Sequence, residues 1–277
     1  MTGSISIVTP CFNAERYVVR TIQSVLAQSA IVSGAIELEY IIVDGDSEDD
    51  TVGLVEALGD DRITVISEPD AGMYDALAKG LSRASGDVVA YLNAGDLYFE
   101  HAFQVVADIF SRHSVDWLTG LKTLINDREE VIGCYRPFRY RRGLIAAGCY
   151  GTSLPFIQQE STFWRRSALD AVDMTRLREF GLAGDAFLWH SFAAAGIELA
   201  VVNSLLGAFR KHEGQLSSQR DKYLAEMRSI SVPGSVDQLL ALWERMLWPM
   251  PWRLKERLGA GQFEFDLESQ SWERGTA

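Results

Sequence analysis

The first hundred residues alternate short apolar runs with segments of helical periodicity, and this alternation constrains the fold most. The apolar runs, rich in Ile and Val, lie at residues 5–9, 40–43, 63–66 and 88–92. Between them, apolar side chains recur at helical spacing, which predicts helices at 17–28, 51–58 and 73–84. Strands that alternate with helices form βαβ units, and uninterrupted apolar strands are buried on both faces. The sequence therefore predicts an α/β fold with a mainly parallel sheet flanked by helices.

The second half of the chain is less regular. Residues 117–124 and 131–135 predict a pair of strands around a polar turn at 126–128. An apolar helix is expected at 186–195, followed by a strand at 197–202. No internal repeat or low-complexity segment interrupts this pattern.

Charge and cysteine content exclude several classes of function. The 277 residues carry a formal net charge of -12, and no basic stripe of the kind that binds nucleic acid is present in the sequence. Cys11, Cys134 and Cys149 fit no metal or redox spacing, so we expect reduced thiols. The start of the chain has no signal-peptide pattern, and no apolar run is long enough to span a bilayer. A cytoplasmic location is expected.

Ligands of parallel α/β sheets bind beyond the carboxyl ends of the strands. The fourth predicted strand ends in Asn93-Ala94-Gly95-Asp96. A carboxylate in such a turn can hold Mg²⁺ or Mn²⁺ against a diphosphate, because these ions combine few protein carboxylates with substrate phosphates. Asn, Gly and Asp are also ordinary turn residues, so this segment alone leaves both interpretations open.

Six further segments of the sequence bear on the role of this turn. The sequence contains IVTPCFNAE at 7–15, IIVDGDSEDDT at 41–51 and SEPDAGMYDA at 67–76. It continues with NAGD at 93–96, QQESTF at 158–163, GDAFLW at 184–189 and FRKH from residue 209. These segments, in this order, resemble the motifs of family 2 glycosyltransferases, which have the GT-A fold.

The resemblance implies an inverting enzyme that moves a sugar from a nucleotide-sugar, by default a UDP-sugar, to an acceptor hydroxyl. It implies Asp185 as the general base and Asp96 as a ligand of Mn²⁺ or Mg²⁺. His212 is a further candidate ligand, or part of a solvated basic turn. Asp44 is implied to accept a hydrogen bond from the nucleotide base. The implied nucleotide-binding residues are Thr9, Pro10, Cys11, Asn13, Glu15, Asp44, Gly72, Asn93, Ala94 and Gly95.

The sequence departs from the family pattern in the loop after the second strand and in the metal motif. Asp46 and Asp50 stand where many members have Gly, and the usual acidic pair of the metal motif is reduced to Asp96. One alternative is therefore a non-catalytic nucleotide-sugar-binding module. A dehydrogenase lacks support, because Pro10-Cys11-Phe12 stands where a dinucleotide fingerprint would begin. Asp185 also has a structural alternative, as a carboxylate that stabilises a helix N-terminus.

The resemblance also suggests how the chain is divided. Residues 1–225 are expected to form the glycosyltransferase domain, with a nucleotide-binding half at 1–100 and an acceptor half at 101–225. Residues 226–277 are expected to form a helical extension and a loose polar tail.

The extension carries a helix candidate at 236–247, and its aromatic residues suit a membrane interface. Between Trp243 and Trp252, Trp side chains are interleaved with Leu, Arg and Lys, which is typical of interfacial helices. Such a contact, at the inner face of the membrane, would suit a glycan acceptor carried on a lipid in surface polysaccharide assembly. Packing against the core or against a second copy is the alternative.

Overall fold

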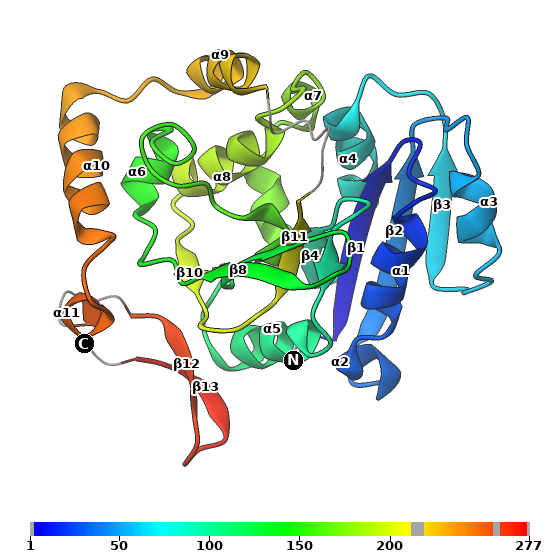
Figure 1. Cartoon of the computed structure of the whole chain (residues 1–277), viewed down its shortest axis with the longest axis horizontal. Coiled ribbons are helices and arrows are strands. Elements are labelled where there is room, and N and C mark those ends of the chain that lie inside the picture. The colour runs from blue at the N-terminus through cyan, green and yellow to red at the C-terminus, as the bar shows by residue number, and fades with distance from the viewer. Residues whose placement is uncertain (1–2, 212–218, 257–260, 276–277) are drawn as a thin grey trace.

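A seven-stranded sheet forms the centre of the molecule. The computed structural model describes residues 3–211, 219–256 and 261–275. The strand order is β10-β6-β9-β4-β1-β2-β3, and all pairs are parallel except those of β9. These strands are β1 (Ser4–Cys11), β2 (Glu37–Asp44), β3 (Ile63–Ser67), β4 (Val88–Tyr91), β6 (Trp117–Thr119), β9 (Thr162–Arg165) and β10 (Leu199–Val201). The mainly parallel α/β sheet predicted from the sequence is confirmed (Figure 1).

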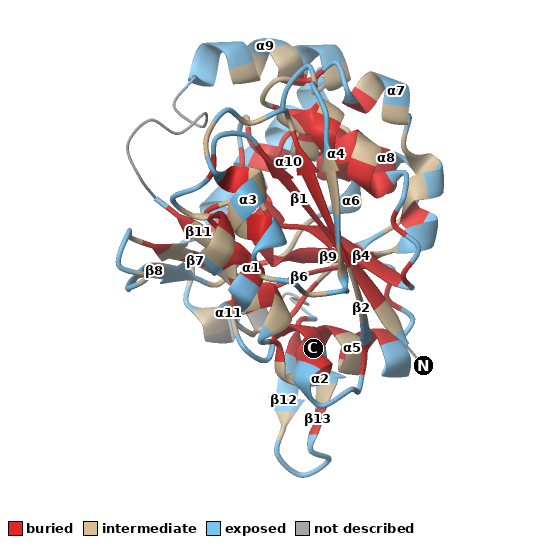
Figure 2. Ribbon diagram, turned by 90° about the vertical axis from the view of Figure 1, so that its right-hand side faces the viewer, coloured by how far each residue is buried: buried red, intermediate tan, exposed pale blue. Residues whose placement is uncertain are grey.

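Helices cover both faces of this sheet. Successive residues of a strand point to opposite faces, so Val8 packs into one core and Ile7 into the other. The Val8 side is covered by α4 (Met73–Leu81), α6 (Arg142–Ala146), α7 (Met174–Leu177) and α8 (Gly184–Ala194). The Ile7 side is covered by α1 (Val18–Leu26), α2 (Ser29–Val32), α3 (Thr51–Glu56) and α5 (Ala102–Arg112). The central strands β1 and β4 between these layers are almost wholly buried, whereas the edge strand β3 is not (Figure 2).

A second, four-stranded sheet lies over the carboxyl end of β4. Its order is β5 (Leu97–Tyr98), β11 (Gly207–Arg210), β7 (Lys122–Ile125) and β8 (Val131–Tyr135). The single strand predicted at 117–124 is wrong, because the chain leaves the large sheet after β6 and enters the small one at β7. The change occurs at Gly120, where a Cβ atom would lie 2.8 Å from the carbonyl oxygen of Ser204.

The C-terminal residues form a hairpin rather than a loose tail. β12 (Phe263–Asp266) pairs antiparallel with β13 (Ser271–Arg274). Phe263 is buried against the ring of His113, whose Nε2 lies 2.7 Å from the carbonyl oxygen of Trp272. The prediction of a loose tail is therefore wrong for these strands, because their aromatic side chains have partners on the body of the protein.

Two longer helices, α9 (Arg220–Ile230) and α10 (Ser235–Leu247), precede the short helix α11 (Trp252–Glu256). The predicted division at residue 225 falls inside α9, which packs on α8, so we propose that the extension begins after α9. In α10, Glu244 is buried beside Arg139 and Arg141, while much of the helix's apolar side chain surface is exposed. No helix of the described residues is both long and apolar enough to cross a membrane.

The junction of the two sheets leaves no room for a side chain at residue 207. A Cβ atom at Gly207 would lie 2.0 Å from the carbonyl oxygen of Glu160. We expect Gly207→Ala to lower the melting temperature, since backbone must move. Gly143→Ala is the matched control: a Cβ there meets nothing within 4 Å, and alanine in a helix is favoured by about 0.5–1 kcal/mol. Equal melting temperatures for the two variants would contradict this packing.

Candidate active site

The turn after β4 holds Asp96 in a fixed, buried position. Thr21 binds the turn from α1: its Oγ1 accepts from the amide of Gly95 and donates to the carbonyl of Asp96, each at 2.9 Å. Asp96 Oδ1 accepts a hydrogen bond of 2.9 Å from the amide of Arg210. The side chain is 4% exposed, and burial raises its pKa to about 7. Burial therefore disfavours the ionised form of this side chain at the carboxyl end of the sheet.

A second buried carboxylate, Glu160, adjoins this turn. Glu160 is 2% exposed, and burial, followed by the charge of Asp96, raises its pKa well above its usual range. Its Oε1 atom and the Oδ1 atom of Asn93 are buried without a hydrogen-bond partner among the described residues. Sequence reasoning did not assign Glu160 a role, because the QQESTF segment gives no sign that this carboxylate is buried.

These oxygen atoms fit a hard divalent cation. Mg²⁺ and Mn²⁺ favour carboxylate and carbonyl oxygens, and Mg²⁺ is commonly held by one or two carboxylates plus substrate phosphates. Asp96 supplies such a carboxylate, and the unpaired oxygen of Asn93 belongs to the same turn. No group of three or more His, Cys, Asp and Glu side chains gathers within the described part of the chain. His212, the further predicted ligand, lies outside the described residues.

The loops that follow β1 and β2 are joined by hydrogen bonds. Asn13, at φ 48°, receives a bond of 2.9 Å from the amide of Glu48 on its Oδ1 and donates its own amide to Ser47 Oγ. Glu15 accepts a bond of 3.2 Å from the amide of Asp50. The two loops therefore form one rigid rim beyond the strands.

Asp44, the last residue of β2, lies beneath these two loops. Its carboxylate is fully buried and accepts bonds from the amide and hydroxyl of Ser47 and from the hydroxyl of Ser67. Cys11 Sγ lies 3.8 Å from Asp44 Oδ1, and burial, with Asp44 next, raises the pKa of the thiol to about 12. The Thr9 hydroxyl instead meets Tyr40 in the core at 3.0 Å.

The remaining predicted nucleotide-binding residues border the same end of the sheet. Pro10 pairs with Val43 at the end of β1, and Ala94 lies in the Asp96 turn. Gly72 precedes α4 at φ 128°, and a Cβ atom there would meet nothing within 4 Å. The structure thus gathers residues from four separate strand ends along one edge.

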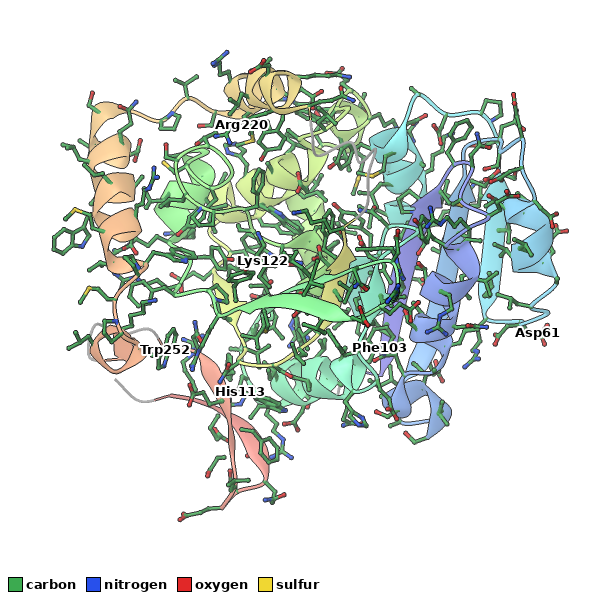
Figure 3. All side chains as sticks on the ribbon, in the orientation of Figure 1. Asp61, Phe103, His113, Lys122, Arg220 and Trp252 are labelled. Atoms are coloured by element: carbon green, nitrogen blue, oxygen red, sulfur yellow. The ribbon has the colours of Figure 1, made fainter. Side chains whose placement is uncertain are left out.

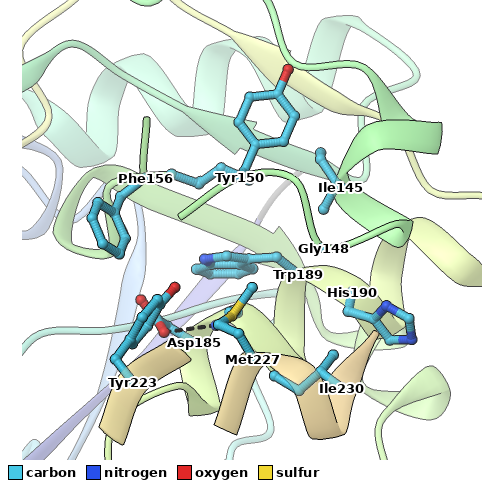
Figure 4. A pocket seen from close by; sticks show the side chains of 12 residues that line it. Ile145, Gly148, Tyr150, Phe156, Asp185, Trp189, His190, Tyr223, Met227 and Ile230 are labelled. Atoms are coloured by element: carbon cyan, nitrogen blue, oxygen red, sulfur yellow. Dashed lines mark hydrogen bonds between the residues drawn. The ribbon is translucent and has the colours of Figure 1, made fainter. Parts of the chain in front are cut away.

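Asp185 lies in the first turn of α8, where it was predicted. One carboxylate oxygen accepts a bond of 2.7 Å from the amide of Ala186, and burial raises the pKa of the half-buried side chain to about 6. Asp185 borders a cavity of about 20 Å³, together with Tyr223, Trp189 and Met227 (Figure 4). A carboxylate with this pKa is ionised at neutral pH and can accept a proton.

Glu226 of α9 positions the chain that leads into α8. Its two carboxylate oxygens accept bonds from the amides of Gly181, Leu182 and Ala183, at 2.8–3.1 Å. Sequence reasoning missed this residue, since the bonds join segments more than forty positions apart and leave no local pattern. The start of α8, and with it Asp185, is therefore fixed by α9.

The fold and this edge define an α/β protein of the GT-A type, with carboxylates at the carboxyl ends of its strands. The model of glycosyl transferase family 2 matches residues 6–172, more than half of the chain. The protein belongs to this family.

Comparisons with individual proteins agree with the family. WfgD of Escherichia coli, a UDP-Glc:alpha-D-GlcNAc-diphosphoundecaprenol beta-1,3-glucosyltransferase, is 27% identical over 46% of this chain and 49% of its own. TuaG of Bacillus subtilis, a putative teichuronic acid biosynthesis glycosyltransferase, is 38% identical over 33% of this chain and 36% of its own. The matches therefore span at most about half the length of these relatives.

Solved structures show the same fold. TarS of S. aureus, solved in complex with UDP-GlcNAc, superposes with a TM-score of 0.63 at 16% identity, over 92% of this chain and 70% of TarS. Glucosyl-3-phosphoglycerate synthase of M. tuberculosis, solved with Mn²⁺ and UDP, superposes with a TM-score of 0.55 at 23% identity, over 84% and 82%.

The raised pKa of Asp185 predicts a pH-dependent effect of Asp185→Asn on stability. A carboxyl whose pKa is raised by folding stabilises the folded state when protonated, and this contribution disappears as pH rises through about 6. Asn does not titrate, so the variant should gain about 1.4 kcal/mol relative to wild type between pH 5 and pH 8. Urea unfolding at both pH values measures this difference.

The matched control is Asp61→Asn, at an exposed position shortly before β3 (Figure 3). It should show no such change with pH. An equal change in both variants would contradict the burial of Asp185.

Proposed function

We propose that this protein is an inverting glycosyltransferase that moves a sugar from a nucleotide-sugar to an acceptor hydroxyl. The observation that carries the proposal is the placement of two carboxylates at one edge of the sheet. Asp96 is fixed and buried in the turn after β4, and Asp185 borders a cavity at the start of α8. Family membership supports the same class of reaction.

In this proposal Asp185 is the general base. It accepts the proton of the acceptor hydroxyl while that oxygen attacks the anomeric carbon, and the nucleoside diphosphate leaves from the opposite face. The bond from the Ala186 amide orients one carboxylate oxygen, and Glu226 keeps the preceding loop in place. Tyr223, which borders the same cavity and is partly exposed, would offer aromatic surface to the acceptor at the mouth of this cavity.

The donor is proposed to be a UDP-sugar, bound across the ends of β1, β2 and β4. The solved relatives titled with UDP-GlcNAc and with UDP support this nucleotide. Asp44 would face the base, and the open space at Gly72 would admit the nucleotide. Asp96, with Asn93, would hold Mn²⁺ or Mg²⁺. When bound, that ion supplies Lewis-acid stabilisation of the charge on the leaving diphosphate.

The acceptor is proposed to be a glycan or a lipid-linked glycan of surface polysaccharide assembly. The names of WfgD and TuaG support this class. The outer face of α10 is apolar and exposed, with Leu239 68% and Met246 63% exposed. We propose that this face, together with the segment from Trp243 to Trp252 that continues it, touches the inner face of the membrane. Interfacial helices present such apolar surface to lipid.

Asp185→Asn tests the general base. The variant should lower the rate of transfer about a hundredfold or more, since general bases contribute factors of this size. Binding of the UDP-sugar should be unchanged, because among the described residues no hydrogen bond joins the Asp185 side chain to the turn of Asp96. The measurement is release of free UDP with a crude glycan acceptor, beside calorimetric titration of the donor.

Glu179→Gln, at an exposed position on the same segment, is the matched control and should retain full activity. Donor binding without any UDP release by the wild-type protein would favour a non-catalytic nucleotide-sugar-binding module. Loss of donor binding in Asp185→Asn would show a structural role for this residue.

Asp96→Asn tests the metal and donor site. UDP should raise the melting temperature of the wild-type protein only when Mn²⁺ or Mg²⁺ is present, because a ligand that binds the folded state stabilises it by mass action. The variant preserves the bond from the Arg210 amide yet removes the charge, so the metal-dependent shift should be lost. A full shift in EDTA would contradict a metal-bridged diphosphate.

A further inference from the structure

A groove lies between α9 and α10, on the side of α9 that faces away from the loop before α8. Its volume is about 460 Å³. Leu224, Val232 and Leu242 form part of an apolar wall, while Arg228, Arg245 and Gln238 line it with polar groups. The groove is therefore amphipathic and large enough for a small ligand or for one segment of a longer one.

The two arginines of the groove have no acidic partner. Neither Arg228 nor Arg245 forms an ion pair or a side-chain hydrogen bond with any other residue that the structure describes. Guanidinium groups bind phosphate oxygens with paired, charge-assisted hydrogen bonds, so two free guanidinium groups in one groove are complementary to a phosphate or diphosphate.

The surroundings of the groove are suited to a hydrocarbon chain. Leu242 lines the groove and is 57% exposed, and the neighbouring Trp243 is 55% exposed. Apolar surface of this extent on one helix marks a binding surface. Anion-binding arginines beside exposed apolar side chains are complementary to an amphiphile that carries a phosphate head on a lipid tail.

The groove is adjacent to the candidate general base. Met227 of α9 lines both the groove and the cavity of Asp185, so the two are neighbours. A lipid-linked acceptor has its sugar joined to the lipid by a phosphate or diphosphate. With the sugar hydroxyl at Asp185, its phosphate would reach the arginines on the other side of Met227.

We propose that the α9–α10 groove binds the lipid-diphosphate portion of the acceptor, with Arg228 and Arg245 on the phosphates and Leu242 against the lipid. The inference rests on the proposed function and deepens it, because it assigns the acceptor to one chemical class. It concerns a site separate from that of the donor, so the two can be tested separately.

The test uses farnesyl diphosphate as a soluble probe and the full chain saturated with UDP and Mn²⁺, so that the donor site is occupied. Titration calorimetry should detect binding of farnesyl diphosphate, and weaker binding of farnesol and of inorganic diphosphate. Arg228→Ala with Arg245→Ala should weaken binding at least about tenfold, because charge-assisted bonds to phosphate are lost. Arg83→Ala, at an exposed arginine after α4, is the matched control.

A second variant keeps the test informative if the arginine variant does not fold. Leu242→Asp places a negative charge at an exposed position of the groove and should also weaken binding about tenfold or more. Val32→Asp, at an exposed position of α2, should have no effect. Melting temperatures and the Mn²⁺-dependent UDP shift should be the same in all variants and wild type.

Three outcomes would overturn the proposal. One is a wild-type protein that binds UDP but not farnesyl diphosphate, and another is binding that neither groove variant weakens. The third is an effect of the arginines only on binding to vesicles of phosphatidylcholine and phosphatidylglycerol, which would assign them to the membrane surface. Failure to bind UDP would instead contradict the proposed function and is recorded by a separate titration.

Discussion

The bonds of Arg210 hold together the segments on which the candidate site depends. Its amide fixes the carboxylate of Asp96, and its Nε donates to the carbonyl of Gly95 at 2.6 Å. The same guanidinium reaches Glu129 on the β7–β8 hairpin at 3.2 Å. A buried guanidinium is stable only when its donors are satisfied, so the small sheet and the Asp96 turn are fixed in one arrangement. Arg210 is thus a structural cation rather than a free one.

Beside Arg210, the protein buries acidic side chains whose charged form the surroundings disfavour. Asp96 and Glu160 are buried with raised pKa values, and Asn93 has an unpaired buried oxygen. Burying polar oxygens without partners, as for Glu160 Oε1 and Asn93 Oδ1, opposes folding, so such groups are uncommon unless a ligand or a reaction uses them. A divalent cation, or the hydroxyl groups of a bound sugar, would supply the missing partners. The edge of the sheet is therefore more consistent with a ligand site than with a set of turns.

The sequence predicted the parts of this site that follow from local pattern. Period and composition indicated β1 to β4 and the start of α8, so Asp96 and Asp185 could be placed at strand and helix ends. The left-handed conformation of Asp46, at φ 66°, also agrees with its place in a glycine position. Glu160 and the β12–β13 hairpin were missed, because burial and docking come from contacts between distant segments. The spacing of residues in the sequence does not reveal contacts between segments that are far apart in the chain.

The helix α9 shows how such distant contacts join two parts of the molecule. Residues two apart on an α-helix point in directions about 200° apart, so Glu226 and Arg228 occupy nearly opposite faces. Glu226 holds the amides that precede Asp185, whereas Arg228 lines the groove toward α10. Met227 lies between them and contributes to both cavities. Any ligand that fixes α9 from the groove therefore also fixes the carboxylate on which the position of Asp185 depends.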